Sequence, residues 1–101
     1  MRKSKNPLPT DFSSMIGRRM RWLRELNDLT LAEVEERSGV TAKTLQRYER
    51  GGLDISTNAI QAVAEALNTR PSVLCGSLEG FCEAVSVAFV FIEQKNGASN
   101  I

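Results

Sequence analysis

Four long polar side chains between positions 43 and 50 are the residues of this sequence best suited to chemistry. They are Lys43, Gln46, Arg47 and Arg50. Their spacing places them along one side of a helix, where lysine, glutamine and arginine can donate hydrogen bonds to phosphates and to the edges of guanine and adenine. The pattern therefore indicates a binding surface made of basic and amide groups.

The residues that catalysis and metal binding usually require are scarce. The sequence has no histidine, the commonest general base and the usual partner of a nucleophilic serine or cysteine. It also has no glycine-rich phosphate loop. Its two cysteines, Cys75 and Cys82, can neither form a disulfide framework nor complete a zinc site, and we expect both to be small buried hydrophobic side chains. We expect no enzyme activity, no metal and no cofactor.

Length and composition predict one compact globular domain. The chain has 101 residues, of which 42% are hydrophobic and 25% are charged. No apolar run approaches the ~20 residues needed to cross a bilayer, and no apolar segment follows the basic start, so we expect a cytoplasmic protein without a membrane partner. Residues 1–70 contain 12 Lys and Arg against 9 Asp and Glu, and residues 71–101 contain one against three. Any attraction to phosphate must therefore lie in the first part of the chain.

The elements that position the polar stripe are predicted to be helices. Residues 1–10 are basic and contain prolines, which is typical of a flexible arm. Residues 11–27 form the first predicted helix, because their apolar side chains recur at steps of three and four residues. These apolar residues are Phe12, Ile16, Met20, Leu23 and Leu26.

The second predicted helix has signals at both ends. Thr30 and Glu33 have the spacing of a capping box, in which each side chain satisfies a backbone N–H of the other residue. Gly39 follows Ser38 and suits the left-handed conformation that ends a helix. Three more helices are predicted over residues 42–50, 57–67 and 71–76.

The order of these parts predicts a helix-turn-helix. A glycine between two short helices lets them cross at a steep angle, and the second helix can then enter the major groove of DNA. The apolar residues expected between the two helices are Val34, Val40, Leu45 and Tyr48.

Four segments, in order and spacing, resemble the lambda-repressor-like, or Xre/Cro, family of helix-turn-helix regulators. They are Ile16–Arg24, Leu29–Thr30, Ser38–Thr41 and Tyr48–Gly51. The resemblance covers about residues 13–76. It implies an all-α domain of five helices that binds double-stranded DNA as a dimer and reads it with the third helix.

The resemblance also implies roles for single residues. The resemblance implies base contacts from Thr41, Ala42, Lys43 and Arg47. Gln46 is expected to make a fifth, because it lies on the same exposed side of the helix. Ala42 stands where a longer polar residue is usual, so it could contact only a thymine methyl group.

Phosphate contacts are expected from Thr30 and Arg50 by resemblance. They are also expected from Arg18 and Arg19 in the first helix, whose alternative is an ordinary solvated face. Leu31 replaces a glutamine that commonly touches the DNA backbone, so we expect this phosphate contact to be missing.

Three charged positions of the resemblance concern the structure of the domain. Arg24 and Glu49 are expected to form an internal ion pair. Glu35 stands where alanine is usual and the helices cross closely, so either the helices separate or its carboxylate pairs with a cation. With Glu33 and Glu36 it makes an acidic face, which is either solvated or offered to a protein partner.

The resemblance does not extend to the last part of the chain. Residues 84–92 are apolar on all sides, and the pattern fits either a strand, which we favour, or a helix. The proposed division is an arm (1–10), the DNA-binding domain (11–76), a dimerisation segment (77–95) and a disordered end (96–101). The dimer contacts expected from a strand are Val85, Val87, Phe89 and Phe91, and the alternative is that this segment covers its own domain.

The sequence therefore predicts a transcriptional regulator, with a repressor favoured, that binds a palindromic operator as a homodimer. The alternative is an antitoxin-like or adaptor protein whose main role is to bind a protein partner.

Overall fold

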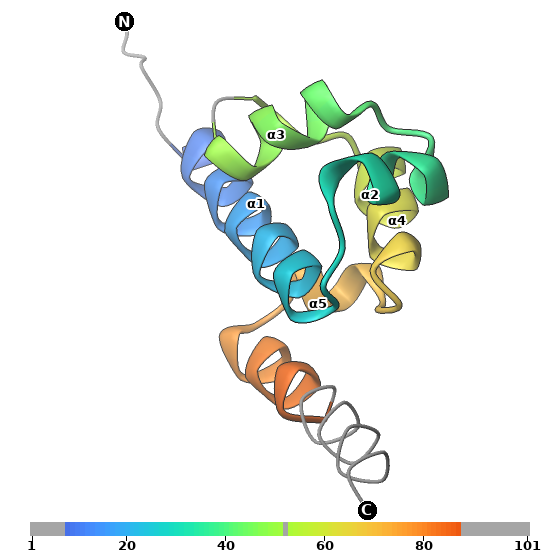
Figure 1. Ribbon diagram of the computed structural model, residues 1–101. Helices are drawn as coiled ribbons and strands as arrows, with labels where there is room; N and C mark the ends of the chain where they lie inside the picture. The colour runs from blue at the N-terminus through green and yellow to red at the C-terminus, as the bar shows by residue number, and fades with distance from the viewer. Residues whose placement is uncertain (1–7, 52, 88–101) are drawn as a thin grey trace, which may run out of the picture.

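The computed structural model describes residues 8–51 and 53–87, and this part of the chain is helical with no strand. Figure 1 shows the arrangement of the elements, which are α1 (Leu8–Leu26), α2 (Leu31–Ser38), α3 (Ala42–Arg50), α4 (Thr57–Ala66) and α5 (Pro71–Cys75). Residues 78–87 are helical as well. The predicted all-α class and the order of five helices are confirmed. In the described ranges we find no helix both long and apolar enough for a membrane span.

Helix α1 begins earlier than the sequence predicts. It starts at Leu8, so the expected arm over residues 1–10 is wrong at its last three positions, while residues 1–7 lie outside the described chain. Pro9 is compatible with this start, because a proline in the first turn of a helix loses no intrahelical hydrogen bond. The apolar stripe of α1 then supplies three core residues, Ile16, Met20 and Leu23.

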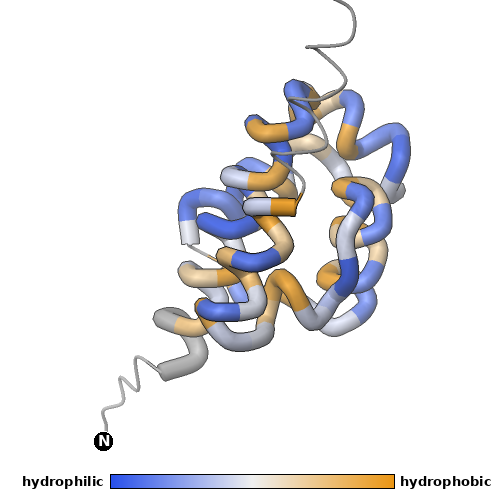
Figure 2. Tube along the Cα trace, turned by 90° about the horizontal axis from the view of Figure 1, so that it is seen from below, coloured by the Kyte–Doolittle hydropathy of each residue, from blue (hydrophilic) through white to orange (hydrophobic). Residues whose placement is uncertain are grey.

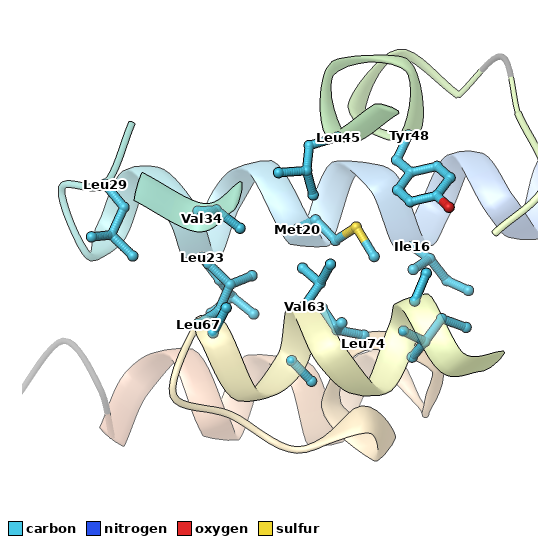
Figure 3. Close-up of a cluster of buried hydrophobic side chains, with 14 residues drawn as sticks. Ile16, Met20, Leu23, Leu29, Val34, Leu45, Tyr48, Val63, Leu67 and Leu74 are labelled. Carbon is cyan, nitrogen blue, oxygen red and sulfur yellow. The ribbon is translucent and has the colours of Figure 1, made fainter. Parts of the chain in front are cut away.

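The core lies between α1 and the other four labelled helices. Helix α1 packs against α3 and α5, and α4 packs against α2 and α5. Hydrophobic and hydrophilic positions alternate along the tube in Figure 2, as amphipathic helices around one core require. Figure 3 shows the side chains that meet at the centre, among them Ile16, Met20, Leu45, Tyr48 and Val63.

The helix over residues 78–87 corrects the interpretation of the last segment. Residues 84–87 are helical, so the favoured strand is wrong there, and residues 88–92, with Phe89 and Phe91, lie outside the described chain. The Phe81 ring stands edge-on to Trp22 of α1 with centroids 6.4 Å apart, and Val85 is half-buried against the core. Tertiary contacts therefore support a helix where the local pattern alone is ambiguous. Val85 and Val87 do not share a face of this helix, because residues two positions apart in a helix are turned about 200° from each other.

The cysteines are less buried than expected. Cys75 is half-buried at the end of α5, and its Sγ is 3.1 Å from the carbonyl oxygen of Pro71. Cys82 is exposed. The expectation of burial is wrong for Cys82 because residues 78–87 contact α1 through the face that carries Phe81, and the next residue is turned about 100° away from it.

Candidate nucleic-acid interface

Helix α2 begins and ends at the residues that the sequence indicates. The N–H of Glu33 donates to the Thr30 hydroxyl at 3.1 Å, and the N–H of Thr30 donates to the Glu33 carboxylate at 2.8 Å, which is the predicted capping box. Gly39 has φ +81° and its N–H donates to the carbonyl of Glu35, so the chain leaves α2 through a left-handed residue. This turn sets the direction in which α3 starts.

Helix α3 is fixed by a cap and two buried side chains. The hydroxyl of Thr41 accepts the N–H of Thr44 at 3.2 Å, and Gly51, with φ +79°, ends the helix. Leu45 and Tyr48 point into the core and are 2% and 7% exposed. These two anchors determine which side of α3 faces outward.

The outward side carries the residues predicted to contact bases. Lys43, Gln46 and Arg47 are exposed, as is Thr41, and Ala42 is half-buried. Helix α3 thus brings all five together. In space, α3 lies at the opposite end of the described structure from residues 78–87 (Figure 1).

A close approach of backbones holds α3 against α1. A side chain at Gly17 would collide with the backbone carbonyl of Tyr48, so only glycine fits where the two helices touch. The Ser14 hydroxyl donates to the carbonyl of Gly51 at 3.3 Å at the end of α3. Substitutions at Gly17 would therefore displace the polar face of α3 without touching it.

Arg24 of α1 and Glu49 of α3 form a two-pronged ion pair. The Arg24 Nε and Nη2 atoms donate to the two Glu49 carboxylate oxygens at 2.7 and 3.0 Å. Nη1 donates to the carbonyl of Leu29 at 2.9 Å. The hydrogen bonds to Glu49 raise the pKa of the Arg24 guanidinium above its ordinary value. The Arg24 side chain joins α1 to α3 and to the segment that leads into α2.

A hollow of about 300 Å³ lies where α1, α2 and α3 meet. Its lining residues are Arg21, Arg24, Leu31, Gln46, Glu49 and Arg50. Arg24 is paired with Glu49, and Arg21 is paired with Glu25 at 3.0 Å. Arg50 is exposed at the end of α3. Leu31 lines the hollow with an apolar side chain, at the position where related regulators commonly have a phosphate-contacting glutamine.

The expectation that Arg19 contacts phosphate is wrong. Arg19 is 6% exposed, and its Nη1 lies 2.9–3.0 Å from the carbonyl oxygens of Val73, Leu74 and Gly76. Its guanidinium also stands 4.9 Å from the centre of the Phe81 ring. The side chain therefore caps the end of α5. Arg18, its neighbour in sequence, is exposed.

Among the described residues the Glu35 carboxylate pairs with backbone and with no cation. Its Oε1 atom accepts the backbone N–H of Ala42 at 2.9 Å, so its carboxylate caps the first residue of α3 while Glu35 stays exposed. Glu33 is engaged in the capping box at the other end of α2. Two of the three acids of the proposed acidic face thus accept hydrogen bonds from backbone N–H groups of this chain, those of Thr30 and Ala42.

Comparison with known proteins agrees with this geometry. A family model described as helix-turn-helix matches residues 20–74, which is more than half of the chain. The chain belongs to this helix-turn-helix family, of the lambda-repressor-like, or Xre, type. The matched range contains α2, α3, α4 and the ion pair, and it ends within α5.

Three curated relatives each match between about half and two thirds of the chain. HTH-type transcriptional regulator y4aM of Sinorhizobium fredii is 33% identical over 57 residues, which are 56% of this chain and 40% of the relative. Regulator y4wC of the same organism is 30% identical over 64 residues, 63% and 45% of the two chains. Antitoxin PezA of Streptococcus pneumoniae is 35% identical over 54 residues, 54% and 34% of the two chains. The chain spans less than half the length of each.

One solved structure shares the fold of this helix-turn-helix protein. The clp gene regulator ClgR from Corynebacterium glutamicum has a TM-score of 0.60 with 24% identity, over 87% of both chains. At this identity the likeness concerns the fold.

Sequence reasoning missed two residues of this helix-turn-helix domain. For Arg19 a signal existed, because Ile16, Arg19, Met20 and Leu23 have the i, i+3, i+4, i+7 spacing of one buried stripe. For Glu35 no local signal existed. Its bond to Ala42 depends on the angle at which α2 and α3 cross.

Proposed function

We propose that this protein is a sequence-specific, DNA-binding transcriptional regulator whose α3 enters the major groove. The observation that carries the proposal is the exposed polar side of α3, held outward by the buried Leu45 and Tyr48. A helix of this kind fits the major groove of B-DNA, where lysine, arginine and glutamine distinguish bases by hydrogen bonds. Two relatives are named HTH-type transcriptional regulators, and this supports the same function.

Base recognition is assigned to residues 41–47, at the start and on the outward side of α3. Lys43 and Arg47 are one helical turn apart and can reach neighbouring base pairs, with guanine O6 and N7 as their preferred acceptors. Gln46 is the third polar reader. Ala42 offers only a methyl group, which suits a thymine methyl, and the Thr41 hydroxyl has a second role in capping α3.

Phosphate contacts are assigned to residues around the hollow and on α1. Thr30 is exposed immediately before α2, and its hydroxyl, which accepts the N–H of Glu33, still has its own O–H to donate to a phosphate oxygen. Arg50 adds an exposed charge at the end of α3, and Arg18 adds one on α1. Such contacts position the protein on DNA without reading its sequence.

A homodimer on a palindromic operator follows from the size of the reading surface. One α3 reaches only a few base pairs, so a second copy related by a twofold axis gives the specificity a regulator needs. Binding over a promoter would block transcription, which favours a repressor. We assign the contact between copies to the segment from residue 77 onwards.

Selection of bound duplexes from a random DNA pool tests the function. We expect enrichment of one sequence whose two halves are inverted repeats, with binding that weakens steeply as salt rises. Failure to enrich any sequence, together with no binding to any duplex at low salt, would contradict the proposal.

A second candidate function is that of an antitoxin-like or adaptor protein. The observation that favours it is the identity to Antitoxin PezA over 54 residues. Here the main task would be to hold a second protein. Expression of the tagged chain in its native cells, followed by mass spectrometry of stably co-purifying proteins, separates this function from the first.

A further inference from the structure

The start of α3 has two different side-chain caps. Thr41 accepts the N–H of Thr44, as an ordinary N-cap does. The N–H of Ala42, one residue into the helix, is bonded instead by the carboxylate of Glu35, which comes from α2. A full negative charge therefore stands at the end of the helix that leads into the groove.

This charge changes what the leading end of α3 can attract. The N-terminus of a helix carries roughly half a positive charge and is ordinarily a site for phosphate. The Glu35 carboxylate already satisfies that potential and repels a phosphate. Groups with hydrogen-bond donors are attracted in its place.

The Glu35 carboxylate keeps capacity for a second partner. An ionised carboxylate has about four acceptor positions on two oxygens, and the bond to Ala42 uses one of them, on Oε1. Glu35 is exposed, and the adjacent Ala42 contributes only a methyl group beside it. The donors that DNA presents in the major groove are the amino groups of cytosine and adenine, and cytosine N4 is the usual partner of a carboxylate.

The geometry points to Glu35 as a specificity-determining residue, which reads the amino group of a cytosine from α2, beside the bases read by α3. The bond to Ala42 N–H fixes the carboxylate against the leading end of α3, so the two helices read DNA as one unit. This inference rests on the proposed function.

The matched variants are Glu35→Gln and Glu36→Gln. The first variant keeps a side-chain oxygen for the Ala42 N–H, but it loses the charge and brings an amide donor. Glu36 is an exposed acid on the same helix, and its replacement removes the same charge one position away. Circular dichroism and thermal unfolding of both variants show whether the fold is retained.

Selection from random duplexes is carried out with the natural chain and both variants, followed by titration of the selected duplex and of one with the critical C·G pair replaced. For the natural chain and for Glu36→Gln we expect the replacement to weaken binding by about 5- to 150-fold, the discrimination of one good base contact. For Glu35→Gln we expect that discrimination to disappear and affinity for random duplex to rise.

The possible failures are distinguishable. If Glu35→Gln keeps the cytosine preference, Glu35 is a helix cap only, and the inference is wrong while the proposed function stands. If Glu36→Gln loses the preference equally, the effect is one of general charge, and the inference is again wrong. If the natural chain binds no duplex, the proposed function fails and this inference fails with it.

Discussion

At the scale of single residues, Lys43 and Arg47 occupy the most informative positions. They lie four residues apart on the side of α3 opposite Leu45 and Tyr48, so one groove can receive both. Replacing either residue by alanine is expected to cost about 1–3 kcal/mol on the selected duplex and much less on random DNA. Fluorescence anisotropy titrations on both duplexes measure this, with Arg70→Ala as a control for loss of one exposed charge. Equal losses on both duplexes would reduce Lys43 and Arg47 to phosphate contacts.

The Arg24–Glu49 pair makes a second prediction at this scale. The two side chains are 16% and 10% exposed, so removing either one leaves the other largely buried without its partner. We expect Arg24→Ala and Glu49→Ala each to lower the free energy of unfolding by about 3 kcal/mol. The double variant is expected to lose less than the two single losses added together, as measured by chemical denaturation. Strict additivity would show that the pair contributes no coupling.

Arg18 and Arg19 are adjacent in sequence, but we expect opposite effects on stability and DNA affinity when each is replaced. Arg19→Ala leaves three carbonyl groups at the end of α5 without their donor and is expected to destabilise the fold by about 2–3 kcal/mol, with DNA affinity retained in the folded protein. Arg18→Ala is expected to change stability by less than about 0.5 kcal/mol and to weaken binding to all duplexes alike. Thermal unfolding measures the stability of each variant, and fluorescence anisotropy measures its affinity for DNA. If a stably folded Arg19→Ala variant lost DNA affinity, this would contradict a purely structural role for Arg19.

At the scale of elements, local signals decide what can be predicted from the sequence. The Thr30–Glu33 capping box, the left-handed Gly39 and the Thr41 cap lie within a few residues of the helix ends that they determine, so the helix-turn-helix was predictable. Glu35 and Arg19 bond to residues of other helices, and those bonds depend on how the helices cross. Residues 84–87 open a segment that is apolar on both faces of a strand or a helix, with Ser86 as its one polar residue. The choice between strand and helix therefore depends on contacts such as that of Phe81 with Trp22, which no local pattern contains.

At the scale of the whole molecule, DNA recognition and dimerisation are assigned to separate parts of the chain. Helix α3 and residues 78–87 lie at opposite ends of the described structure (Figure 1). Residues 78–87 retain exposed apolar side chains, with Leu78 68% and Val87 70% exposed. Two copies that paired through this segment would leave both α3 helices free to contact DNA.

Deletion of residues 77–101 tests this separation. All the buried hydrophobic residues of the described chain lie between Ile16 and Leu74, so the shortened protein is expected to remain folded. It is also expected to be a monomer. Its affinity for a palindromic duplex should fall by orders of magnitude, because the second half-site then no longer binds as an intramolecular event. Its affinity for a single half-site should change little.

Sedimentation of the full-length and shortened chains at tens of micromolar measures the assembly, and titration of duplexes with one or two half-sites measures its effect on binding. In a dimer, the twofold axis must place the two α3 helices about 34 Å apart, one turn of DNA, so inserting five base pairs between the half-sites should remove the advantage of the second one. A full-length chain that sediments as a monomer, or a shortened chain that stays a dimer, would contradict the assignment of residues from 77 onwards to dimerisation. In the first case the exposed side chains of Leu78 and Val87 would belong to an interface with a different protein, as the antitoxin-like function requires.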